Sequence, residues 1–314
     1  MSGCAYLSDI LASSDHTPVI ERDLKAGAYI VGSLILHPSR ALITTTRVSP
    51  LMSPPSFKST PSRIAIVTGA AQGLGEGIAL RLAEDGLDVA IFDLPSKRGQ
   101  LKAVGDAITA KGRRSLVLVG DITVEGDVVA MVAQTVEELG GLDVMIANAG
   151  VFGSTPFLDL AVEEFDRILR VNVRGAMLCI QHAARQMVKQ GRGGRIIGAS
   201  SLAGKQGFPM VTSYVTSKFA VRGLTQSVAA ELKEHNITVN TYAPSVVVTP
   251  MTTHPDDEKN GGAAATLFKN TGIPLDTKVI PLAEVAELVA YLAKPDTSSI
   301  TGQCFSINGG LYMD

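Results

Sequence analysis

The sequence predicts an α/β fold, with a doubly wound parallel sheet in a single domain that follows an irregular N-terminal extension. Short β-branched runs alternate with helical patterns from residue 63 onward, as expected when helices cover both faces of a parallel sheet. A glycine-rich turn joins the first run to the first helix. Tyr214 and Lys218 are four residues apart, and Ser201 precedes Tyr214 by thirteen residues at the end of another apolar run. These features predict a ligand site beyond the carboxyl ends of the strands.

Residues 1–60 differ in composition from the rest and are predicted to be irregular or disordered. They contain Ser, Thr and Pro clusters, such as residues 51–56, and no sustained hydrophobic period. One domain is therefore expected over residues 61–314. Met52 stands about ten residues before that domain and is an alternative start.

The composition of the extension also bears on where in the cell the protein is located. A mitochondrial transit peptide is rich in Arg and poor in acids, whereas residues 1–23 contain four acids and Arg22 as their one base. We therefore expect a cytoplasmic protein. Mitochondrial targeting stays open, because residues 24–63 contain bases and no acid.

The overall composition excludes several classes of protein. The chain has 314 residues, 46% of them hydrophobic, and a net charge of −2 at pH 7. A sizeable core is expected, with no nucleic acid or membrane surface as a partner. The longest apolar stretch near the front, Ala26 to Leu36, is too short to span a bilayer. Cys4, Cys179 and Cys304 show neither disulfide nor metal spacing, so we expect no metal and a reducing compartment.

The predicted strands and helices alternate along the domain. Strands are expected at residues 63–67, 87–92, 115–119, 142–146, 195–199, 237–242 and 304–307. Helices are expected at residues 75–85, 98–111, 125–139, 160–190 and 214–235. Because a helical pattern separates most of the strands, they are expected to be parallel.

The glycine-rich turn lies between the first strand and the first helix, with the spacing G-x-x-x-G-x-G. This is the context of a Rossmann-type dinucleotide site, where backbone N–H groups approach a pyrophosphate at the positive end of the helix. An ordinary turn is the alternative. The residues predicted to contact the cofactor here are Gly69, Gln72, Gly73, Leu74 and Gly75.

Asp93 ends the second predicted strand, eighteen residues after Gly75. An acid near this offset binds the adenosine ribose hydroxyls, and its charge repels the 2′-phosphate of NADP. The glycine turn contains no Lys or Arg that could bind a phosphate, so NAD is the preferred cofactor. NADP is the alternative, because Lys97 and Arg98 could offset the repulsion, although such residues ordinarily form a solvated helix start.

Tyr214 and Lys218 are predicted to share one face of a helix, because four residues span about one turn. An ammonium close to a phenol favours the phenolate, so we expect Lys218 to lower the pKa of Tyr214. A tyrosine tuned in this way can exchange a proton near neutral pH. Ser201 would face it from a strand end. For the Tyr-Lys pair alone, a solvated helix face is the alternative.

Further motifs follow in a fixed order. Asp121-Ile122 and Asn148-Ala149-Gly150 come after the third and fourth predicted strands. The later motifs are Asn172, Pro244, Thr249-Pro250-Met251, Thr301-Gly302-Gln303 and Asn308-Gly309-Gly310. Together with the glycine turn, Ser201, Tyr214 and Lys218, they resemble the short-chain dehydrogenase/reductase family, in its ordinary single-domain form, across about 250 residues.

The resemblance implies that the catalytic residues are Asn172, Ser201, Tyr214 and Lys218. Tyr214 would be the acid in carbonyl reduction and the base in alcohol oxidation. Ser201 would hydrogen-bond the substrate oxygen as charge develops on it. Lys218 would lower the pKa of Tyr214 and bind the nicotinamide ribose, so that both residues also belong to the cofactor site. Asn172 would hold a water in a proton relay, or would only link a helix to a strand.

The resemblance also implies cofactor contacts outside the glycine turn. Asp121 and Ile122 would contact adenine, Asn148 the neighbouring ribose, and Thr249 the carboxamide, with Val247 in the same site. Asp121 could instead cap the next helix, and Asn148 could simply hold its turn.

Residues 214–226 and the Thr249-Pro250-Met251 ending resemble the diacetyl/acetoin reductase (butanediol dehydrogenase) branch. That branch often has Gln after the catalytic serine to hold a second oxygen, whereas Leu202 stands here. Ser245 follows Pro244 where the family usually has Gly, which puts the geometry near the nicotinamide in question. The segment from residue 252 to 274 contains no cluster of Arg, which favours a small, neutral substrate.

We therefore expect an NAD(P)-dependent oxidoreductase that interconverts a small ketone and a secondary alcohol, with acetoin or diacetyl as candidates. A 3-oxoacyl-carrier-protein reductase and a polyol dehydrogenase are alternatives. A nucleotide-binding regulator without turnover is the alternative of a different class, although such proteins usually lose the tyrosine or lysine.

A homodimer or homotetramer is also expected, because family members commonly pair the helices predicted at 160–190 and 214–235. These helices carry apolar residues beyond one stripe, among them Ile168, Val171, Val173, Met177, Leu178 and Ile180.

Overall fold

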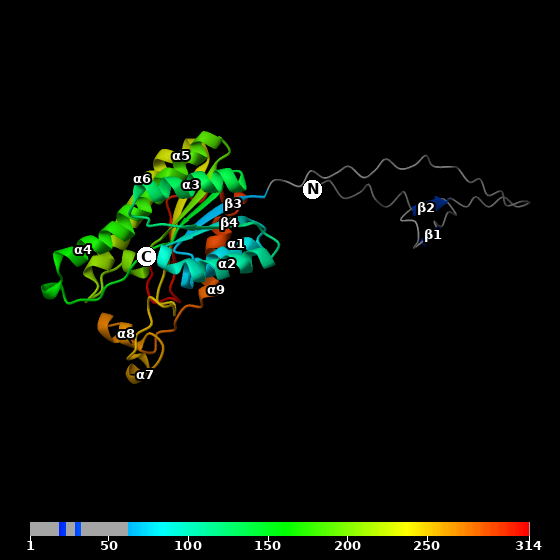
Figure 1. Ribbon diagram of the computed structural model, residues 1–314. Helices are drawn as coiled ribbons and strands as arrows, with labels where there is room; N and C mark the ends of the chain where they lie inside the picture. The colour runs from blue at the N-terminus through cyan, green and yellow to red at the C-terminus, as the bar shows by residue number, and fades with distance from the viewer. Residues whose placement is uncertain (1–18, 23–28, 33–61, 314) are drawn as a thin grey trace, which may run out of the picture. The chain divides into compact units, whose positions relative to one another are not determined.

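The computed structural model describes residues 19–22, 29–32 and 62–313 (Figure 1). The chain divides into two units, Met1–Ser59 and Thr60–Asp314. In the first unit, β1 (Val19–Arg22) and β2 (Tyr29–Gly32) pair antiparallel. The sequence analysis predicted an irregular extension and missed this pair of strands. The rest of that prediction lies outside the described residues.

The second unit is built on a seven-stranded parallel sheet, which confirms the predicted fold class. The strand order is β5-β4-β3-β6-β7-β8-β9, and every neighbouring pair is parallel. The strands are β3 (Ile64–Thr68), β4 (Asp88–Asp93), β5 (Ser115–Val119), β6 (Val144–Ala147), β7 (Gly194–Ala199), β8 (Ile237–Pro244) and β9 (Cys304–Ile307). The order in which strands are added to the sheet reverses between β3 and β6, which is where such sheets bind ligands.

Helices cover both faces of the sheet (Figure 1). One face packs against α1 (Gly73–Glu84), α2 (Arg98–Ala110) and α9 (Leu282–Leu292). The other packs against α3 (Glu125–Leu139), α5 (Ala176–Gln190) and α6 (Thr212–Leu232). Two short helices, α7 (Asp257–Asn260) and α8 (Ala265–Thr271), lie in the segment between β8 and α9.

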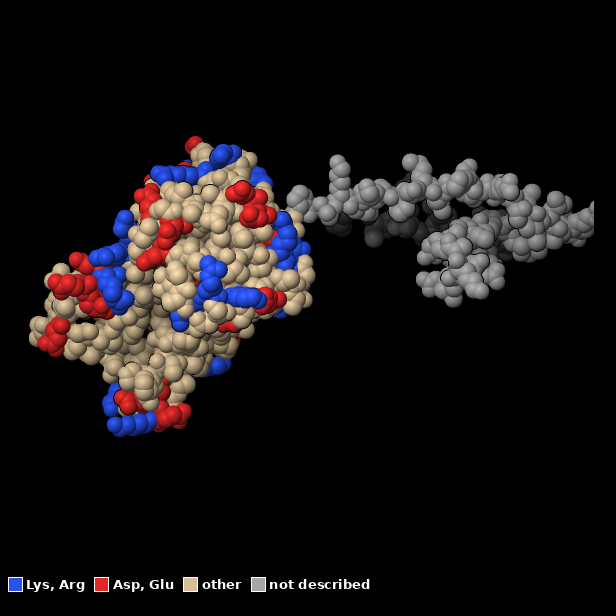
Figure 2. All heavy atoms as spheres, in the orientation of Figure 1, with Lys and Arg blue, Asp and Glu red and all other residues tan. Residues whose placement is uncertain are grey.

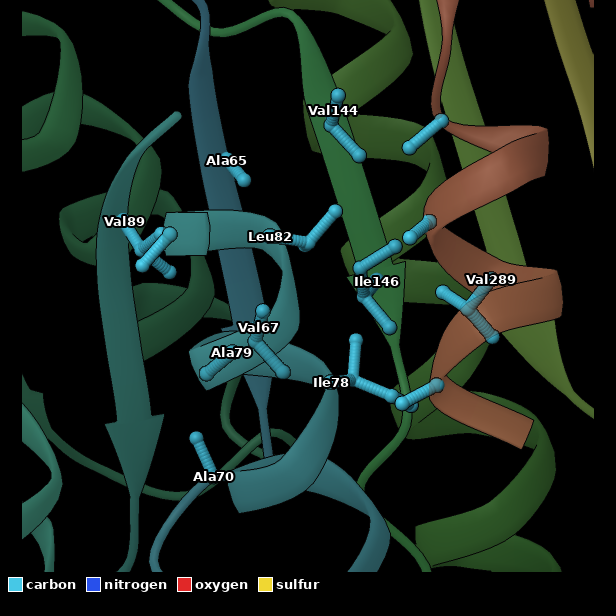
Figure 3. Close-up of a cluster of buried hydrophobic side chains, with 14 of the residues drawn as sticks. Ala65, Val67, Ala70, Ile78, Ala79, Leu82, Val89, Val144, Ile146 and Val289 are labelled. Carbon is cyan, nitrogen blue, oxygen red and sulfur yellow. The ribbon is translucent and has the colours of Figure 1, made fainter. Parts of the chain in front are cut away.

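Successive residues of a strand pack into two different apolar clusters, one on each face of the sheet. Ala65 and Val67 of β3 enter the cluster under α1 and α9, whereas Ile64 and Ile66 enter the cluster on the opposite face, because successive strand residues point to opposite faces. Figure 3 shows the first cluster, in which the side chains of α1 and α9 converge on β3 and β6. All five residues of β3 are buried, as expected for a strand covered on both sides.

The predicted helix at 160–190 is interrupted. It consists of α4 (Val162–Leu169), a π-helical stretch η3 (Arg170–Gly175) and α5. Asn172 lies in this stretch, and Gly175 packs so closely on Ile122 that a Cβ would approach its Cδ1 within 2.6 Å. A π-turn inserts a residue into the helical ladder and often marks a functional site.

Several shorter elements complete the unit, and the sequence analysis predicted none of them. The helices α7, α8 and α9 fall in or after the segment expected to select the substrate. The single-turn 3-10 helices are η1 (Pro95–Lys97), η2 (Phe157–Asp159), η4 (Leu202–Gly204), η5 (Lys233–His235) and η6 (Pro295–Thr297).

The surface agrees with the near-neutral net charge. On the face drawn in Figure 2, basic and acidic side chains are interspersed over the coloured part of the molecule. None of the helices in the described ranges is both long enough and apolar enough to span a bilayer.

Removal of residues 1–60 should leave the second unit folded, because its two large apolar clusters are built from residue 64 onward. We expect the thermal unfolding midpoint of the truncated chain to equal that of the full chain in parallel calorimetric scans. A clear fall in the midpoint, or insolubility of the truncated chain, would contradict this expectation.

Candidate active site

A cavity of about 420 Å³ opens at the carboxyl edge of the sheet. Its walls come from the segments that follow β3, β4, β5, β6, β7 and β8. Every residue predicted to contact the cofactor lines it: Gly69, Gln72, Gly73, Leu74, Gly75, Asp93, Asp121, Ile122, Asn148, Tyr214, Lys218, Val247 and Thr249. Of the predicted catalytic residues, Ser201, Tyr214 and Lys218 line the cavity as well, whereas Asn172 does not.

The glycine turn has the shape that a pyrophosphate requires. Gly69 and Gly73 have φ angles of +66° and +60°, which favour glycine. A Cβ on Gly75 would lie 2.1 Å from the Gly69 carbonyl oxygen, so only glycine fits. Gln72 precedes α1 without a side-chain cap, which leaves the first N–H groups of the helix available to an anion.

Asp93 holds its carboxylate at the cavity wall through two backbone contacts. Oδ2 accepts from the Ala71 N–H at 3.0 Å, and Oδ1 accepts from the Leu94 N–H at 2.8 Å. Lys97 also lines the cavity, and its ammonium donates to Gln72 Oε1 at 3.2 Å. Arg98 is exposed and lies outside the cavity lining.

Asn148 and Asp121 both use their side chains within the protein. The Asn148 amide donates to the Thr68 carbonyl at 2.8 Å and accepts from the Tyr242 hydroxyl at 2.7 Å. The Asn148 side chain therefore holds its turn, which was the alternative to a contact with the ribose. Asp121 Oδ1 accepts from the Thr123 N–H at 2.8 Å. This bond closes a turn, so the alternative that Asp121 caps α3 is wrong; Val124 stands at the N-cap.

The proposed catalytic side chains meet at the end of β7. Ser201 follows this strand, and its hydroxyl is hydrogen-bonded with Tyr214. Tyr214 lies in the first turn of α6, where its ring packs edge-on against Phe152 at 5.0 Å between centroids. Lys218 lies one turn further on: its ammonium donates to the Ala199 carbonyl at 2.9 Å and sits 5.4 Å from the centre of the tyrosine ring.

A second, smaller cavity of about 80 Å³ adjoins Ser201 and Tyr214. Its walls are largely apolar: Phe152, Leu202, Ala203, Phe208, Val211, Val246, Met251, Leu267 and Ile273. Ser245, Thr252 and Thr271 are its other polar members. We call this space the substrate chamber. The sequence analysis placed substrate selection after Met251 but missed the walls contributed before Tyr214.

The chain matches the family model described as short chain dehydrogenase over residues 63–260. It is also 45% identical to a short-chain dehydrogenase/reductase of Armillaria gallica over 262 residues, which are 82% of this chain and 99% of the relative. The chain belongs to the short-chain dehydrogenase/reductase family. It is thus an oxidoreductase of the kind that acts on CH–OH groups and binds NAD(P).

Other relatives carry more specific names. An L-2,3-butanediol dehydrogenase of Corynebacterium glutamicum is 39% identical, with 81% of this chain and all of the relative covered. A 3-oxoacyl-[acyl-carrier-protein] reductase of Staphylococcus aureus is 38% identical, with coverages of 80% and 99%.

Solved structures of the family superimpose on this dehydrogenase. A short-chain type dehydrogenase/reductase of Mycobacterium marinum has a TM-score of 0.73 and 36% identity, with 81% of this chain and 97% of the other covered. An acetoin dehydrogenase of Enterobacter cloacae gives 0.69 and 35%, with coverages of 80% and 96%. A short chain dehydrogenase of Mycobacterium paratuberculosis bound to NAD gives 0.72 and 31%, with coverages of 79% and 97%.

The pKa of the dehydrogenase's tyrosine differs from the sequence expectation. Burial raises the pKa of Tyr214 to about 12, and the hydrogen bond with Ser201 opposes that rise. Burial also lowers the pKa of Lys218 to about 8. The sequence analysis expected a lowered tyrosine pKa; the net shift is upward instead, because loss of solvation dominates. Tyr214 keeps its proton at neutral pH, as an acid in carbonyl reduction requires.

The Asn172 side chain connects the π-helical stretch η3 to Val151 and to Ser217. Its Oδ1 accepts from the Val151 N–H at 2.8 Å, and its Nδ2 donates to the Val151 carbonyl at 2.9 Å and to Ser217 Oγ at 3.0 Å. The side chain therefore makes a structural link, but to the loop after β6 and to α6 rather than to a strand as the alternative had it. A role in a proton relay stays a prediction.

Among the described residues, no group of three or more His, Cys, Asp or Glu side chains is placed to hold a metal ion.

Tyr214→Phe should lower turnover roughly a hundredfold to ten-thousandfold, the usual contribution of a positioned acid. The ring and its contact with Phe152 are kept, so NADH binding, measured by fluorescence titration, should hardly change. Tyr291→Phe is the matched control, because Tyr291 lies on α9, 49% exposed. Substantial activity in the Tyr214 variant would refute its assignment as the acid.

Lys218→Met should abolish turnover and weaken nicotinamide binding, yet raise thermal stability at neutral pH. The folded protein holds a lysine whose pKa falls from 10.5 to about 8. The unfolded chain therefore binds more protons between those pH values, and wild-type stability rises with pH across that window.

The stability gap between the Met variant and the wild type should be largest below pH 8 and should shrink toward pH 10.5. Thermal melts of both proteins over a pH series, without added nucleotide, measure it. A gap that does not change with pH would show that Lys218 is not buried as an ammonium.

Proposed function

We propose that this enzyme interconverts a small, uncharged ketone and a secondary alcohol, with NAD(H) as the preferred cofactor. The observation that carries the proposal is one shared cavity, in which the glycine turn, Asp93 and the group Ser201, Tyr214 and Lys218 all lie. A bound nicotinamide supplies the hydride, and the protein supplies position and charge.

In reduction, Ser201 holds the carbonyl oxygen while Tyr214 donates its proton to it; in oxidation Tyr214 takes the proton back. Lys218 places a positive charge beside the tyrosine, which stabilises the phenolate left after donation. The Phe152 ring and the apolar chamber walls exclude water from the reacting oxygen, which strengthens these interactions. Asn172 holds the Val151 loop beside the site.

The relatives and the chamber favour more than one class of substrate. The relatives named for butanediol and acetoin favour a vicinal oxygenated substrate such as acetoin or diacetyl. Leu202 argues against the glutamine contact of that branch. The reductase relative keeps a 3-oxoacyl-carrier-protein substrate as a second candidate, and a polyol remains a third.

A panel of small ketones, with loss of NADH absorbance as the readout, tests the proposal. Reduction of any neutral ketone that Tyr214→Phe cannot reduce supports it. Absence of turnover on every ketone and on the reverse alcohols, with NADH still bound, would favour the non-catalytic nucleotide-binding regulator.

The preference for NAD rests on Asp93. A carboxylate accepts hydrogen bonds from both ribose hydroxyls but repels a 2′-phosphate. Like charges a few ångströms apart near a surface cost on the order of 1–4 kcal/mol, which corresponds to roughly a fivefold to nearly thousandfold preference. Lys97, bonded to Gln72, is the cation available to offset this repulsion.

Asp93→Ser should shift the ratio of kcat/KM toward NADP(H) by roughly tenfold or more, mainly through cofactor KM. Asp106→Ser is the control, because this carboxylate lies 68% exposed on α2 and lines neither cavity. Preference of the wild type for NADP(H) would mean that Lys97 binds the phosphate and that the assignment of Asp93 is wrong.

We further propose a homodimer or homotetramer. Ile168, Leu178 and Ile180 were expected to support it, but they are buried in the protomer. Val162 on α4, Val188 on α5 and Phe219 on α6, which are 68%, 38% and 43% exposed, are exposed apolar residues of these helices that could pair. Val171, Val173 and Met177 are partly buried. Light scattering at micromolar concentration should report more than one copy, and a monomer would refute the proposal.

A further inference from the structure

Thr252 lines both cavities, and its side chain is hydrogen-bonded to the threonine expected to meet the nicotinamide. Met251 also lines both cavities, whereas Thr249 lines only the larger one. The segment that these residues form lies against the glycine turn, since a Cβ on Gly73 would be 3.4 Å from Thr249 Cβ. The segment from Thr249 to Thr252 therefore borders both the cofactor loop and the substrate chamber.

The Thr252 hydroxyl anchors this segment to the chain that follows β8. Its one proton has two carbonyl oxygens within reach, that of Val247 at 2.6 Å and that of Thr249 at 3.2 Å. The hydroxyl oxygen in turn accepts from the Thr249 backbone N–H at 3.0 Å. Because Val247 is buried, Thr249 is held against a fixed part of the protein.

The proton count decides how the two threonine hydroxyls are oriented. Thr249 Oγ1 and Thr252 Oγ1 are 3.4 Å apart, and by distance alone either could be the donor. A carbonyl oxygen can only accept, so the single proton of Thr252 is used by one of its two carbonyl partners. Thr252 is then the acceptor for the Thr249 hydroxyl, which keeps a lone pair of Thr249 Oγ1 for a further donor.

A nicotinamide carboxamide carries such a donor in its N–H groups. Thr249 lines the same cavity as the glycine turn and Asp93, and it is the residue expected to contact the carboxamide. A freely rotating hydroxyl could offer either its proton or a lone pair, whereas a hydroxyl held by Thr252 offers the lone pair. Fixing a binding group before the ligand arrives lowers the cost of binding.

We propose that Thr252 is a positioning residue for the cofactor: its hydroxyl holds Thr249 as a hydrogen-bond acceptor for the carboxamide N–H of the nicotinamide. The inference rests on the proposed use of a nicotinamide cofactor at this site, and it adds how this chain recognises the carboxamide. Thr252 acts through Thr249 and is not itself a catalytic residue.

Calorimetric titration with two reduced cofactors tests the proposal without any turnover. One is NADH, and the other is its 3-acetylpyridine analogue, in which a methyl ketone replaces the carboxamide and no amide N–H remains. The wild type should bind NADH more tightly than the analogue. Thr252→Val should lower this preference, measured as the ratio of the two Kd values, roughly three- to tenfold, the usual effect of one neutral hydrogen bond. A general loss of shape would weaken both cofactors and cancel in the ratio.

Two further variants serve as controls. Thr252→Ser keeps the hydroxyl and should retain the wild-type ratio. Thr253→Val should also retain it, because Thr253 Oγ1 donates to the Thr249 carbonyl at 2.9 Å but Thr253 is exposed and lines neither cavity. If Thr252→Val does not fold, Thr252→Ala removes the same hydroxyl and gives the same readout.

A double variant tests whether Thr252 acts through Thr249. Thr249→Val should lower the preference for NADH at least as much as Thr252→Val. The two substitutions together should lower it no further than Thr249→Val alone, because residues that share one interaction are not additive. Fully additive losses would overturn the proposal.

A wild type without preference for NADH over the analogue, or an unchanged Kd ratio in Thr252→Val, would also overturn it. Failure of the wild type to bind NADH at all would refute the proposed function and the inference together. A wild type that binds NADH and reduces ketones, with an unchanged ratio in Thr252→Val, would refute the inference alone. The two failures are therefore distinguishable.

Discussion

One amide ties three parallel strands together at the edge where the cavity opens. Asn148 follows β6, donates to the Thr68 carbonyl of β3 and accepts from the Tyr242 hydroxyl of β8. Gly75 packs against this amide. Only glycine fits there, because a Cβ would come within 2.6 Å of Asn148 Nδ2. The first turn of α1 is therefore held on the sheet with its N–H groups free to meet an anion. The cofactor loop therefore takes its position on the sheet from this partly buried contact.

Burial sets the chemistry at the same edge. It raises the pKa of Tyr214 to about 12 and lowers that of Lys218 to about 8, so both shifts favour the neutral forms. At neutral pH the tyrosine keeps the proton that reduction needs, while the lysine still carries a charge that can stabilise the phenolate afterwards. A fully hydrated pair would place the lysine charge beside a solvated phenol, where it would act more weakly.

Much of this site could be predicted from the sequence because its residues stand at strand ends. Gly69, Asp93, Asp121, Asn148 and Ser201 each end a strand or follow its end within two residues, so parallel strands place them on one edge, whatever the helices do between them. The substrate chamber could not be predicted in this way, since its walls come from separate loops and from α8. The π-turn at Asn172 was also missed, because one inserted residue hardly alters hydrophobic periodicity. The tyrosine pKa was predicted in the wrong direction, because spacing reports neighbours but not solvation.

The part of the chamber wall near α8 is held by hydrogen bonds within its own segment. The Asp257 carboxylate accepts backbone N–H bonds from His254, Ala264 and Thr266 at 2.9, 3.3 and 3.0 Å, which lower its pKa to about 2. It therefore stays ionised well below neutral pH and fixes the loop around α7 and the start of α8, beside a small cluster that includes Phe268. Apolar residues of this segment can change without disturbing the strands.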